Sequence, residues 1–376
     1  MTAVVRPGDR VAAAVTTGPR RTEVRTLSVP ATGPSDGLMV VEAAGMCGSD
    51  VSMYAADLPE RVMGHENVGV LTNVGEIAAE RWGFSDGDRV LLEEYLPCGH
   101  CSYCRGGEFR SCLASDTSLN PEAVRFGSTP LSVAPGLWGG YSQVMYVHAS
   151  AVMHRVPDGV PSTLATLGLP LGNGYQWACL DGRVRPGETV VVLGPGQSGI
   201  GGAAAAGLAG ARVVVVGRAR DRARLEVARE LGAEAVFVTG PGGDHDEAAV
   251  RSYVADMTGG RLADLVIDAA AGDDETVSLA IDLLAKRGRL ILAAASRTAL
   301  SRFPVWQLSR KQVELRAVRG HSWESVEWAL GELASDRLPF ELMSSYVGGL
   351  ADVDHALRAT AGEGAEPILH ATITPA

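Results

Sequence analysis

The middle of the chain predicts an α/β protein built on a doubly wound parallel sheet. Four short apolar runs alternate there with three helical patterns. The runs span residues 189–193, 213–216, 265–267 and 290–293, and the helical patterns span 199–210, 221–231 and 280–285. A continuous apolar run is typical of a strand buried on both faces, and strands that alternate with helices indicate parallel order.

The segments on either side predict a second, β-rich domain. Residues 37–42 and 68–74 are short strand-like runs bounded by turn-forming residues, and residues 368–373 alternate between apolar and polar side chains. Such alternation is typical of half-buried strands. With 376 residues, the chain is long enough for two domains. We predict one domain from 1–162 and 300–376, with an α/β domain of 163–299 inserted, opening on a helix over 164–180.

Composition and charge exclude several classes of partner. The hydrophobic fraction is 46%, typical of a globular protein, and the net charge is −11. An acidic protein repels the phosphate backbone of nucleic acids, so we expect no nucleic-acid partner. The most apolar stretch, 189–216, is broken by Pro195, Gln197, Ser198 and several glycines. It does not fit a bilayer span of roughly 20 apolar residues, and we expect a cytoplasmic protein with no membrane partner.

A glycine loop between the first predicted strand and helix indicates a dinucleotide site. Its sequence fits G-x-G-x-x-G and comprises Gly194, Pro195, Gly196, Gln197, Ser198 and Gly199. In such a loop the first glycine permits a tight turn, the second lets the backbone approach a pyrophosphate, and the third packs the helix on the strand. The unpaired N–H groups of the helix then face the phosphates. The alternative is an ordinary strand-to-helix turn.

The end of the next predicted strand bears on the choice of cofactor. NAD sites usually place an acid there to bind the ribose hydroxyls. In this chain Gly217 occupies the strand end, and Arg218, Arg220 and Arg222 follow it. These side chains suit the 2′-phosphate of NADP through charge-assisted hydrogen bonds. We therefore expect NADP rather than NAD, although the arginines would equally suit the solvated start of a helix.

Four cysteines crowd into a short segment in residues 95–115. Their spacing is C-x2-C-x2-C-x7-C, formed by Cys98, Cys101, Cys104 and Cys112. Four thiolates close a tetrahedron around zinc with no open position, which is a structural site. An iron–sulfur cluster uses similar spacing, and four free thiols are the remaining alternative. We predict a structural zinc lobe.

Taken together, these motifs resemble those of the medium-chain, zinc-containing alcohol dehydrogenase family, including its sorbitol and threonine dehydrogenase branches. The resemblance covers nearly the whole chain. Besides the cysteine lobe and the glycine loop, it rests on Gly45-Met46-Cys47-Gly48-Ser49-Asp50, Gly64-His65-Glu66, Gly139-Gly140-Tyr141-Ser142-Gln143 and Gly288-Arg289-Leu290. It implies a GroES-like catalytic domain and a Rossmann domain, a small-molecule substrate, and a homodimer or homotetramer.

The same resemblance assigns roles in hydride transfer between nicotinamide and an alcohol or ketone. Cys47 and His65 match the first two ligands of a catalytic zinc. Glu66 matches an acid beside that metal, which ligates it in some members of the family. Asp50 matches the carboxylate that orients the histidine ligand, and Ser49 matches the hydroxyl that takes the substrate proton.

Two departures from the family pattern leave alternatives open. The third family ligand aligns with Leu169, which cannot bind metal, and the family's relay histidine is replaced near Ser52. If Glu66 is the third ligand, three protein ligands and one open position still suit a catalytic zinc, and we favour this. The alternatives are a zinc-free reductase of an imine or activated alkene and a non-catalytic NADPH-binding protein.

Overall fold

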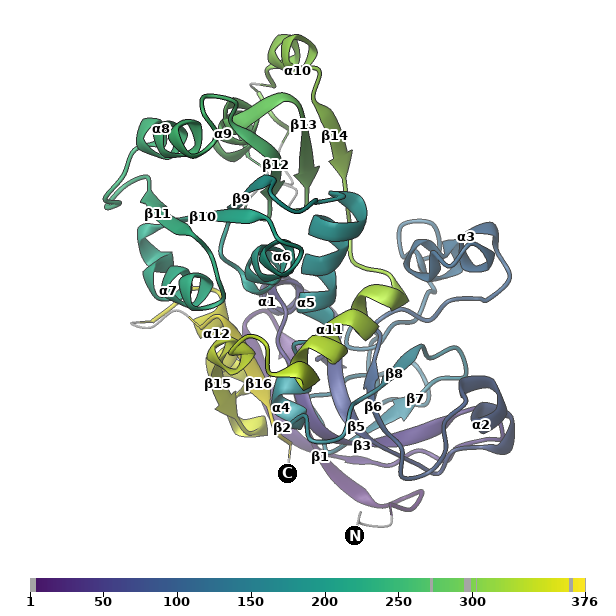
Figure 1. Ribbon diagram of the computed structural model, residues 1–376. Coiled ribbons are helices and arrows are strands. Elements are labelled where there is room, and N and C mark those ends of the chain that lie inside the picture. Colours follow the sequence, from purple (N-terminus) through teal and green to yellow (C-terminus); the bar gives the residue numbers. More distant parts are fainter. Residues whose placement is uncertain (1–4, 271–272, 294–298, 302, 365–367, 376) are drawn as a thin grey trace. The chain divides into compact units, whose positions relative to one another are not determined.

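A parallel six-stranded sheet with strand order β11-β10-β9-β12-β13-β14 forms the centre of one part of the chain (Figure 1). The computed structural model describes residues 5–270, 273–293, 299–301, 303–364 and 368–375. By its contacts the chain divides into two units. The catalytic unit comprises 1–169, 330–336 and 344–376, and the nucleotide unit comprises 170–329 and 337–343.

The nucleotide unit confirms the predicted doubly wound sheet. Its strands are β9 (Thr189–Leu193), β10 (Arg212–Arg218), β11 (Ala235–Thr239), β12 (Ala263–Asp268), β13 (Leu284–Leu292) and β14 (Glu314–Ala317). Its helices are α6 (Gln197–Leu208), α7 (Arg222–Glu230), α8 (Glu247–Met257), α9 (Asp274–Leu283) and α10 (Val305–Lys311). All five residues of β9 are buried, as the continuous apolar run predicted.

The predicted domain boundaries at 162 and 300 differ from the observed ones. The nucleotide unit begins at Pro170 and keeps the chain as far as Ala329, because β14 pairs in parallel with β13 and so completes the sheet. All four side chains of β14 are exposed, so this edge strand lacks the apolar run by which the inner strands were predicted. The predicted helix at 280–285 is α9, which ends at Leu283, where β13 takes over.

The helical connection predicted over 164–180 is present as several short pieces. They are α4 (Ser162–Ala165), α5 (Gly168–Tyr175) and a π-helical turn over Gln176–Asp181. The boundary between the units falls within α5 and again within α11 (Trp323–Ser335). In the described residues no helix combines the length and the apolar character that crossing a bilayer requires.

The catalytic unit is β-rich, as predicted. A three-stranded sheet joins β1 (Arg10–Gly18), β2 (Arg21–Ser28) and β4 (Arg61–Val62). A larger sheet has the order β15-β16-β3-β5-β6-β8, with β7 also paired to β3. Its strands are β3 (Gly37–Gly45), β5 (Glu66–Thr72), β6 (Arg89–Leu92), β7 (Val144–Val147), β8 (Met153–Arg155), β15 (Ser344–Gly348) and β16 (His370–Ile373). The helices of this unit include α1 (Gly48–Ala55), α2 (Glu76–Trp82), α3 (Ser102–Arg105) and α12 (Val353–Thr360).

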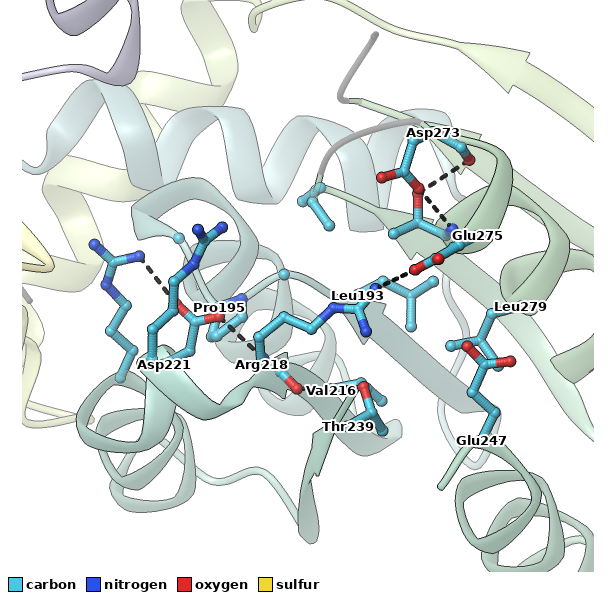
Figure 2. A pocket seen from close by; sticks show the side chains of 18 residues that line it. Leu193, Pro195, Val216, Arg218, Asp221, Thr239, Glu247, Asp273, Glu275 and Leu279 are labelled. Carbon is cyan, nitrogen blue, oxygen red and sulfur yellow. Dashed lines mark hydrogen bonds and ion pairs between the residues drawn. The ribbon is translucent and has the colours of Figure 1, made fainter. Parts of the chain in front are cut away.

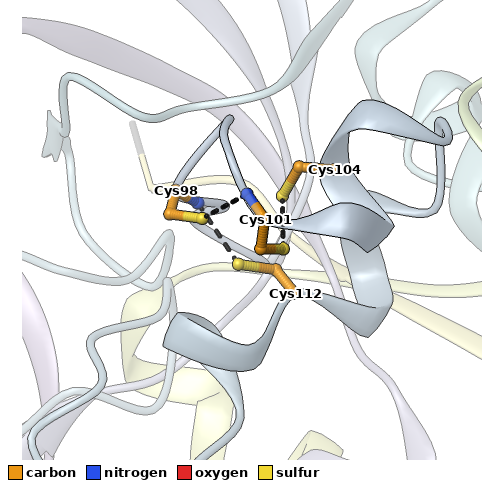
Figure 3. A group of neighbouring side chains, drawn as sticks. All are labelled: Cys98, Cys101, Cys104 and Cys112. Carbon is orange, nitrogen blue, oxygen red and sulfur yellow. Dashed lines mark hydrogen bonds between the residues drawn. The ribbon is translucent and has the colours of Figure 1, made fainter.

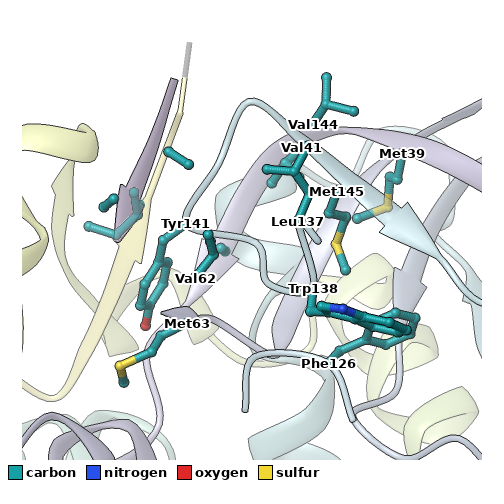
Figure 4. Close-up of a cluster of buried hydrophobic side chains, with 14 of the residues drawn as sticks. Met39, Val41, Val62, Met63, Phe126, Leu137, Trp138, Tyr141, Val144 and Met145 are labelled. Atoms are coloured by element: carbon teal, nitrogen blue, oxygen red, sulfur yellow. The ribbon is translucent and has the colours of Figure 1, made fainter. Parts of the chain in front are cut away.

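Aromatic and sulfur-containing side chains fill the core of the catalytic unit. Figure 4 shows Trp138 beside Phe126, with Tyr141 and Met63 close to each other. The Trp138 and Tyr146 rings meet edge to face with 5.1 Å between centroids, a geometry that aromatic quadrupoles favour. This packed core fixes the loop that carries Tyr141.

Candidate functional site

Three candidate metal ligands, which we call the ligand cluster, lie where β3 ends and β5 begins. They are Cys47, His65 and Glu66. Cys47 follows β3 and caps α1, while His65 and Glu66 lie at the start of β5. One ligand atom from each residue lies within 4.8 Å of the others. Antiparallel pairing of Gly45 with Glu66 brings the two strand ends to one place. The structure thus assembles the three residues that the sequence proposed as zinc ligands.

Asp50 orients the histidine of the cluster. Its Oδ1 lies 3.2 Å from His65 Nδ1, and its Oδ2 accepts hydrogen bonds from the Cys47 backbone N–H at 2.9 Å and the Tyr141 hydroxyl at 3.2 Å. With Nδ1 engaged, the histidine is left with Nε2 for a metal. A carboxylate–histidine pair of this kind fixes the ring and its tautomer at metal sites.

Burial and charge compete in setting the protonation of these groups. Burial lowers the pKa of His65, but the Asp50 carboxylate outweighs that effect and raises it well above the ordinary value. Burial, reinforced by Asp50, raises the pKa of Tyr141, so this hydroxyl stays protonated and donates. Ser49 is exposed, and its Oγ lies 3.4 Å from His65 Nε2. The structure therefore places Ser49 beside the ligand cluster.

The donor set of the ligand cluster fits zinc. A thiolate, an imidazole and a carboxylate are three of the ligand types zinc takes, at about 2.0–2.3 Å from the metal. Ligand atoms within 4.8 Å of one another are compatible with a common tetrahedral centre. Leu169, at the third family position, is 3% exposed and offers no donor atom. Glu66 is the carboxylate that the cluster offers beside Cys47 and His65.

The four cysteines of the lobe converge as predicted. Figure 3 shows Cys98, Cys101, Cys104 and Cys112 facing a common point, and their sulfurs lie within 4.8 Å of one another. The Cys101 and Cys104 sulfurs are 3.5 Å apart, much longer than the roughly 2.05 Å of a disulfide, and all six cysteines of the chain are free. Four thiols in this arrangement fit a closed zinc site.

Backbone amides of the lobe point at its sulfurs. Cys112 Sγ accepts from the N–H of Cys98 at 3.3 Å, and Cys98 Sγ accepts from the N–H of Cys101 at 3.4 Å. Burial alone would raise the pKa of Cys112, but hydrogen bonds from backbone N–H groups reverse this and lower it to about 6. These hydrogen bonds favour the thiolate form of Cys112 that binds metal, whereas burial, reinforced by the neighbouring Cys101, raises the pKa of Cys104 to about 12.

Two arginines connect the lobe to the residues that flank it in the sequence. The guanidinium of Arg110 lies 4.4 Å from the centroid of the Tyr95 ring, and that of Arg125 lies 4.2 Å from it. Arg110 also pairs with the buried carboxylate of Glu93 at 2.9 Å, and Arg125 donates from Nε to the Ser115 carbonyl at 2.8 Å. A change in the shape of the lobe would therefore disturb the buried Arg110–Glu93 pair.

The glycine loop borders a cavity of about 270 Å³ in the nucleotide unit (Figure 2). Gly194 has φ +95°, in the region that favours glycine. A Cβ at Gly196 would meet no atom within 4 Å, whereas one at Gly199 would lie 2.1 Å from the Gly194 carbonyl oxygen. The second glycine therefore leaves room for a ligand and the third allows close helix–strand packing, as a dinucleotide loop requires.

Only part of the predicted cofactor set lines this cavity. Gly194, Gly196, Arg218 and Arg220 do, together with Arg224, which was not among the predicted cofactor residues. Gln197, Ser198 and Gly199 continue into the first turn of α6, outside the lining. Ser198 Oγ instead accepts from Asn173 Nδ2 at 3.3 Å.

Arg222 also lies outside the lining. Its guanidinium pairs with the Asp244 carboxylate and donates to the Gly242 carbonyl at 3.2 Å. Of the three arginines predicted to contact the cofactor, the structure places two beside the cavity and the third in a surface ion pair. Arg224 takes its place because α7 starts at Arg222 and turns Arg224 inward, where it pairs with Asp221 at 3.2 Å.

Tyr141 and His370 also lie at the site, although the sequence pattern assigned neither of them a role. Tyr141 stands inside the motif Gly139–Gln143, which was already noted, so its position carried a signal. His370 is fully buried on β16, with Nδ1 3.9 Å from Glu66 Oε2. More than 300 positions separate it from Glu66 in the sequence, and no pattern near His370 pointed to this contact.

Comparisons with known proteins agree with this arrangement. Residues 33–158 match the family model described as alcohol dehydrogenase GroES-like domain, and residues 199–335 match the one described as zinc-binding dehydrogenase. The chain is 35% identical to a probable alcohol dehydrogenase of Mycobacterium tuberculosis over 98% of this chain and 99% of the relative. The chain belongs to the zinc-type medium-chain alcohol dehydrogenase family. It is therefore a nicotinamide-dependent oxidoreductase of the zinc type.

Two further likenesses come from within the family. The chain is 29% identical to an erythritol/L-threitol dehydrogenase of Mycolicibacterium smegmatis, covering 75% of this chain and 76% of the relative. The solved structure of an alcohol dehydrogenase from Thermus sp. ATN1 superposes with a TM-score of 0.81 at 26% identity, over 97% of this chain and 100% of that one. The resemblance inferred from the motifs and the predicted fold class are both confirmed.

Proposed function

We propose that this alcohol dehydrogenase relative transfers hydride between NADP and an alcohol or ketone at a zinc held by Cys47, His65 and Glu66. The observation that carries the proposal is the ligand cluster, whose three donor atoms lie within 4.8 Å of one another although the third family ligand is replaced by Leu169. A bound zinc supplies Lewis acidity to the substrate oxygen, and a bound nicotinamide exchanges the hydride.

The residues around the cluster have separate tasks in this proposal. Asp50 holds the His65 ring through Nδ1, and Tyr141 holds Asp50. Ser49 Oγ accepts the alcohol proton in oxidation and returns it in reduction, because it is exposed and lies beside His65. With Ser52 near the family's relay position, Ser49 passes this proton to solvent without a relay histidine.

NADP is supported by the cavity beside the glycine loop. A Cβ at Gly217 would lie 2.9 Å from Pro195 Cγ, so the strand end has no room for an acidic side chain. Arg218, Arg220 and Arg224 line the cavity and suit a 2′-phosphate. Four acids also line it, namely Asp221, Glu247, Asp273 and Glu275. Asp221 and Glu275 are engaged by Arg224 and Arg218 respectively.

Elemental analysis and turnover test the proposal together. We expect two zinc ions per chain in the wild type and one in Cys47→Ser, with NADPH consumed in the presence of a panel of ketones. One zinc in the wild type with chelator-resistant reduction would instead support the zinc-free reductase of an imine or activated alkene. Tight NADPH binding without turnover on any substrate class would support a non-catalytic NADPH-binding protein.

We further propose that the chain forms a homo-oligomer through the β14 edge. This strand ends the six-stranded sheet, and an unpaired edge is a surface on which another chain can pair. Exposed apolar side chains lie on and near it, with Trp306 65%, Val305 59%, Phe303 38% and Leu315 37% exposed. A second copy would cover both the strand edge and this apolar patch.

We also propose a cytoplasmic location. All six cysteines are free, and a four-thiol lobe retains its metal-binding form in a reducing compartment.

A further inference from the structure

His370 and Glu66 meet across a strand that separates them. Glu66 lies on β5 and His370 on β16, and β3 runs between these two strands. Neighbouring strands lie about 4.8 Å apart, so side chains two strands apart are ordinarily about twice that distance from each other. Here His370 Nδ1 lies 3.9 Å from Glu66 Oε2. The intervening strand must therefore leave a gap.

Gly45 provides that gap. On β3 it pairs with Glu66 on one side and with Thr372 on the other, and His370 precedes Thr372 by two residues, on the same face of β16. A Cβ at Gly45 would lie 2.6 Å from Glu66 Oε2 and 2.9 Å from His370 Cε1. Any side chain at Gly45 would thus displace the carboxylate, the imidazole or both.

The far side of the His370 ring is held by buried hydroxyls. Thr166 Oγ1 lies 2.9 Å from His370 Nε2 and 2.8 Å from the Thr163 carbonyl oxygen. When the one hydroxyl hydrogen of Thr166 is donated to Nε2, the neutral ring carries its own hydrogen on Nδ1, the edge that faces the Glu66 carboxylate. Thr372 Oγ1 lies 3.4 Å from the same Thr166 oxygen. His370, Thr166 and Thr372 are all fully buried. The ring is thereby fixed at Nε2, so its Nδ1 edge stays in front of Glu66.

We propose that His370 is a positioning residue that holds the Glu66 carboxylate in the ligand cluster through the gap at Gly45. The inference rests on the proposed zinc site, in which Glu66 replaces the ligand missing at Leu169. In this proposal β16 does not bind the metal itself. Its residue His370 instead holds one of the metal's ligands in place. Groups that orient metal ligands typically change metal affinity by about 10- to 100-fold when they are removed.

Titration of the zinc-depleted protein with Co²⁺ tests this role without measuring activity. The thiolate of Cys47 gives bound Co²⁺ a visible spectrum that reports the number and geometry of its ligands. His370→Asn keeps an amide near the Nδ1 position facing Glu66, whereas His370→Gln keeps one near Nε2 facing Thr166. We expect His370→Gln and His370→Leu to weaken the ligand cluster for Co²⁺ by about tenfold or more. His370→Asn should stay within about threefold of the wild type.

Occupancy of the cysteine lobe and the melting temperature control for misfolding, since both depend on a folded catalytic unit. Equal Co²⁺ affinity and equal spectra in the wild type, His370→Gln and His370→Leu would overturn the positioning role. Glu66→Gln separates the two proposals. If Glu66→Gln loses the second metal while His370→Leu keeps it, only the role of His370 fails. If the wild type binds a single metal ion, the proposed zinc site itself is wrong and the inference fails with it.

Discussion

The backbone N–H of Arg218 donates a hydrogen bond to the Asp221 carboxylate at 3.0 Å, and this contact bears directly on the choice of cofactor. Asp221 is the acid nearest the end of β10, but its second oxygen pairs with Arg224 at 3.2 Å. A carboxylate engaged on both sides is a poor partner for ribose hydroxyls. Arg218, which also pairs with Glu275 at 3.0 Å, and Arg220 are cationic groups beside the cavity that suit a phosphate.

We therefore predict that Arg218→Ala and Arg220→Ala each weaken NADPH binding while leaving NADH binding nearly unchanged. A hydrogen bond to a charged group contributes about 1.5–3 kcal/mol, so the dissociation constant for NADPH should rise about 10- to 100-fold. Fluorescence titration with each cofactor measures this. Arg222→Ala is the matched control, because Arg222 pairs with Asp244 outside the cavity lining. Tighter binding of NADH than NADPH by the wild type would contradict the proposal.

We predict that replacing one cysteine of the lobe removes its metal and strongly lowers the stability of the protein. Cys101→Ser removes one of four converging sulfurs and opens the closed site, so we expect loss of the lobe metal and a fall of about 4 kcal/mol or more in the free energy of unfolding. Chemical denaturation and metal analysis measure the two quantities. Cys179→Ser is the control, since Cys179 lies outside the lobe and contacts the Ala205 carbonyl. A Cys101→Ser protein that keeps its metal and its stability would show that the lobe binds no zinc.

Leu169 offers a gain-of-ligand test of the alignment. If it occupies the third family ligand position, Leu169→Glu adds a carboxylate beside the ligand cluster and should tighten metal binding there by about tenfold, worth about 1.4 kcal/mol. Competition with a chelator of known zinc affinity measures the change. Leu169→Gln has the same shape without the charge and should not tighten binding. Unchanged affinity in the folded Leu169→Glu protein would show that Leu169 does not occupy the ligand position.

The exposed patch on α10 and β14 predicts that oligomerisation depends on Trp306. A charge at a buried interface position is costly unless it is paired, so Trp306→Glu should shift the protein towards the monomer. Light scattering after size-exclusion chromatography gives the mass directly. Ile77→Glu, at a residue 48% exposed on α2 of the catalytic unit, controls for an added surface charge. A monomeric wild type would contradict the proposed interface.

We predict that His148 contributes to the decrease in the free energy of unfolding as the pH falls. Its Nδ1 accepts from the Ser150 N–H at 3.0 Å, and burial lowers its pKa. The unfolded chain therefore binds this proton more readily, and the stabilising contribution is lost as the pH falls below about 6.5, the ordinary pKa of histidine. His148→Asn keeps an acceptor but does not titrate. Its free energy of unfolding should fall less than that of the wild type between pH 7.5 and 5.5, and equal slopes would contradict this assignment.

Local patterns in the sequence determined much of this protein. The apolar run of β9, the glycine loop behind it and the four spaced cysteines each act within a few residues. Periodicity and spacing therefore predicted a parallel sheet, a dinucleotide loop and a zinc lobe. Strand β14 could not be predicted from an apolar run, because its four side chains are exposed. Its membership of the sheet, and with it the boundary of the nucleotide unit, depends on backbone pairing with β13.

Tertiary structure decided the details of the two sites. The helical turn at the start of α7 places Arg222 at the surface and Arg224 beside the cavity. The sequence, in which arginines occupy alternate positions, does not show which of them faces the cavity. Glu66 meets His370 only because β16 returns from the end of the chain to pair with β3, where Gly45 leaves room for both side chains. Contacts between strands far apart in the sequence leave no local pattern, because their partners are set by the order of the sheet.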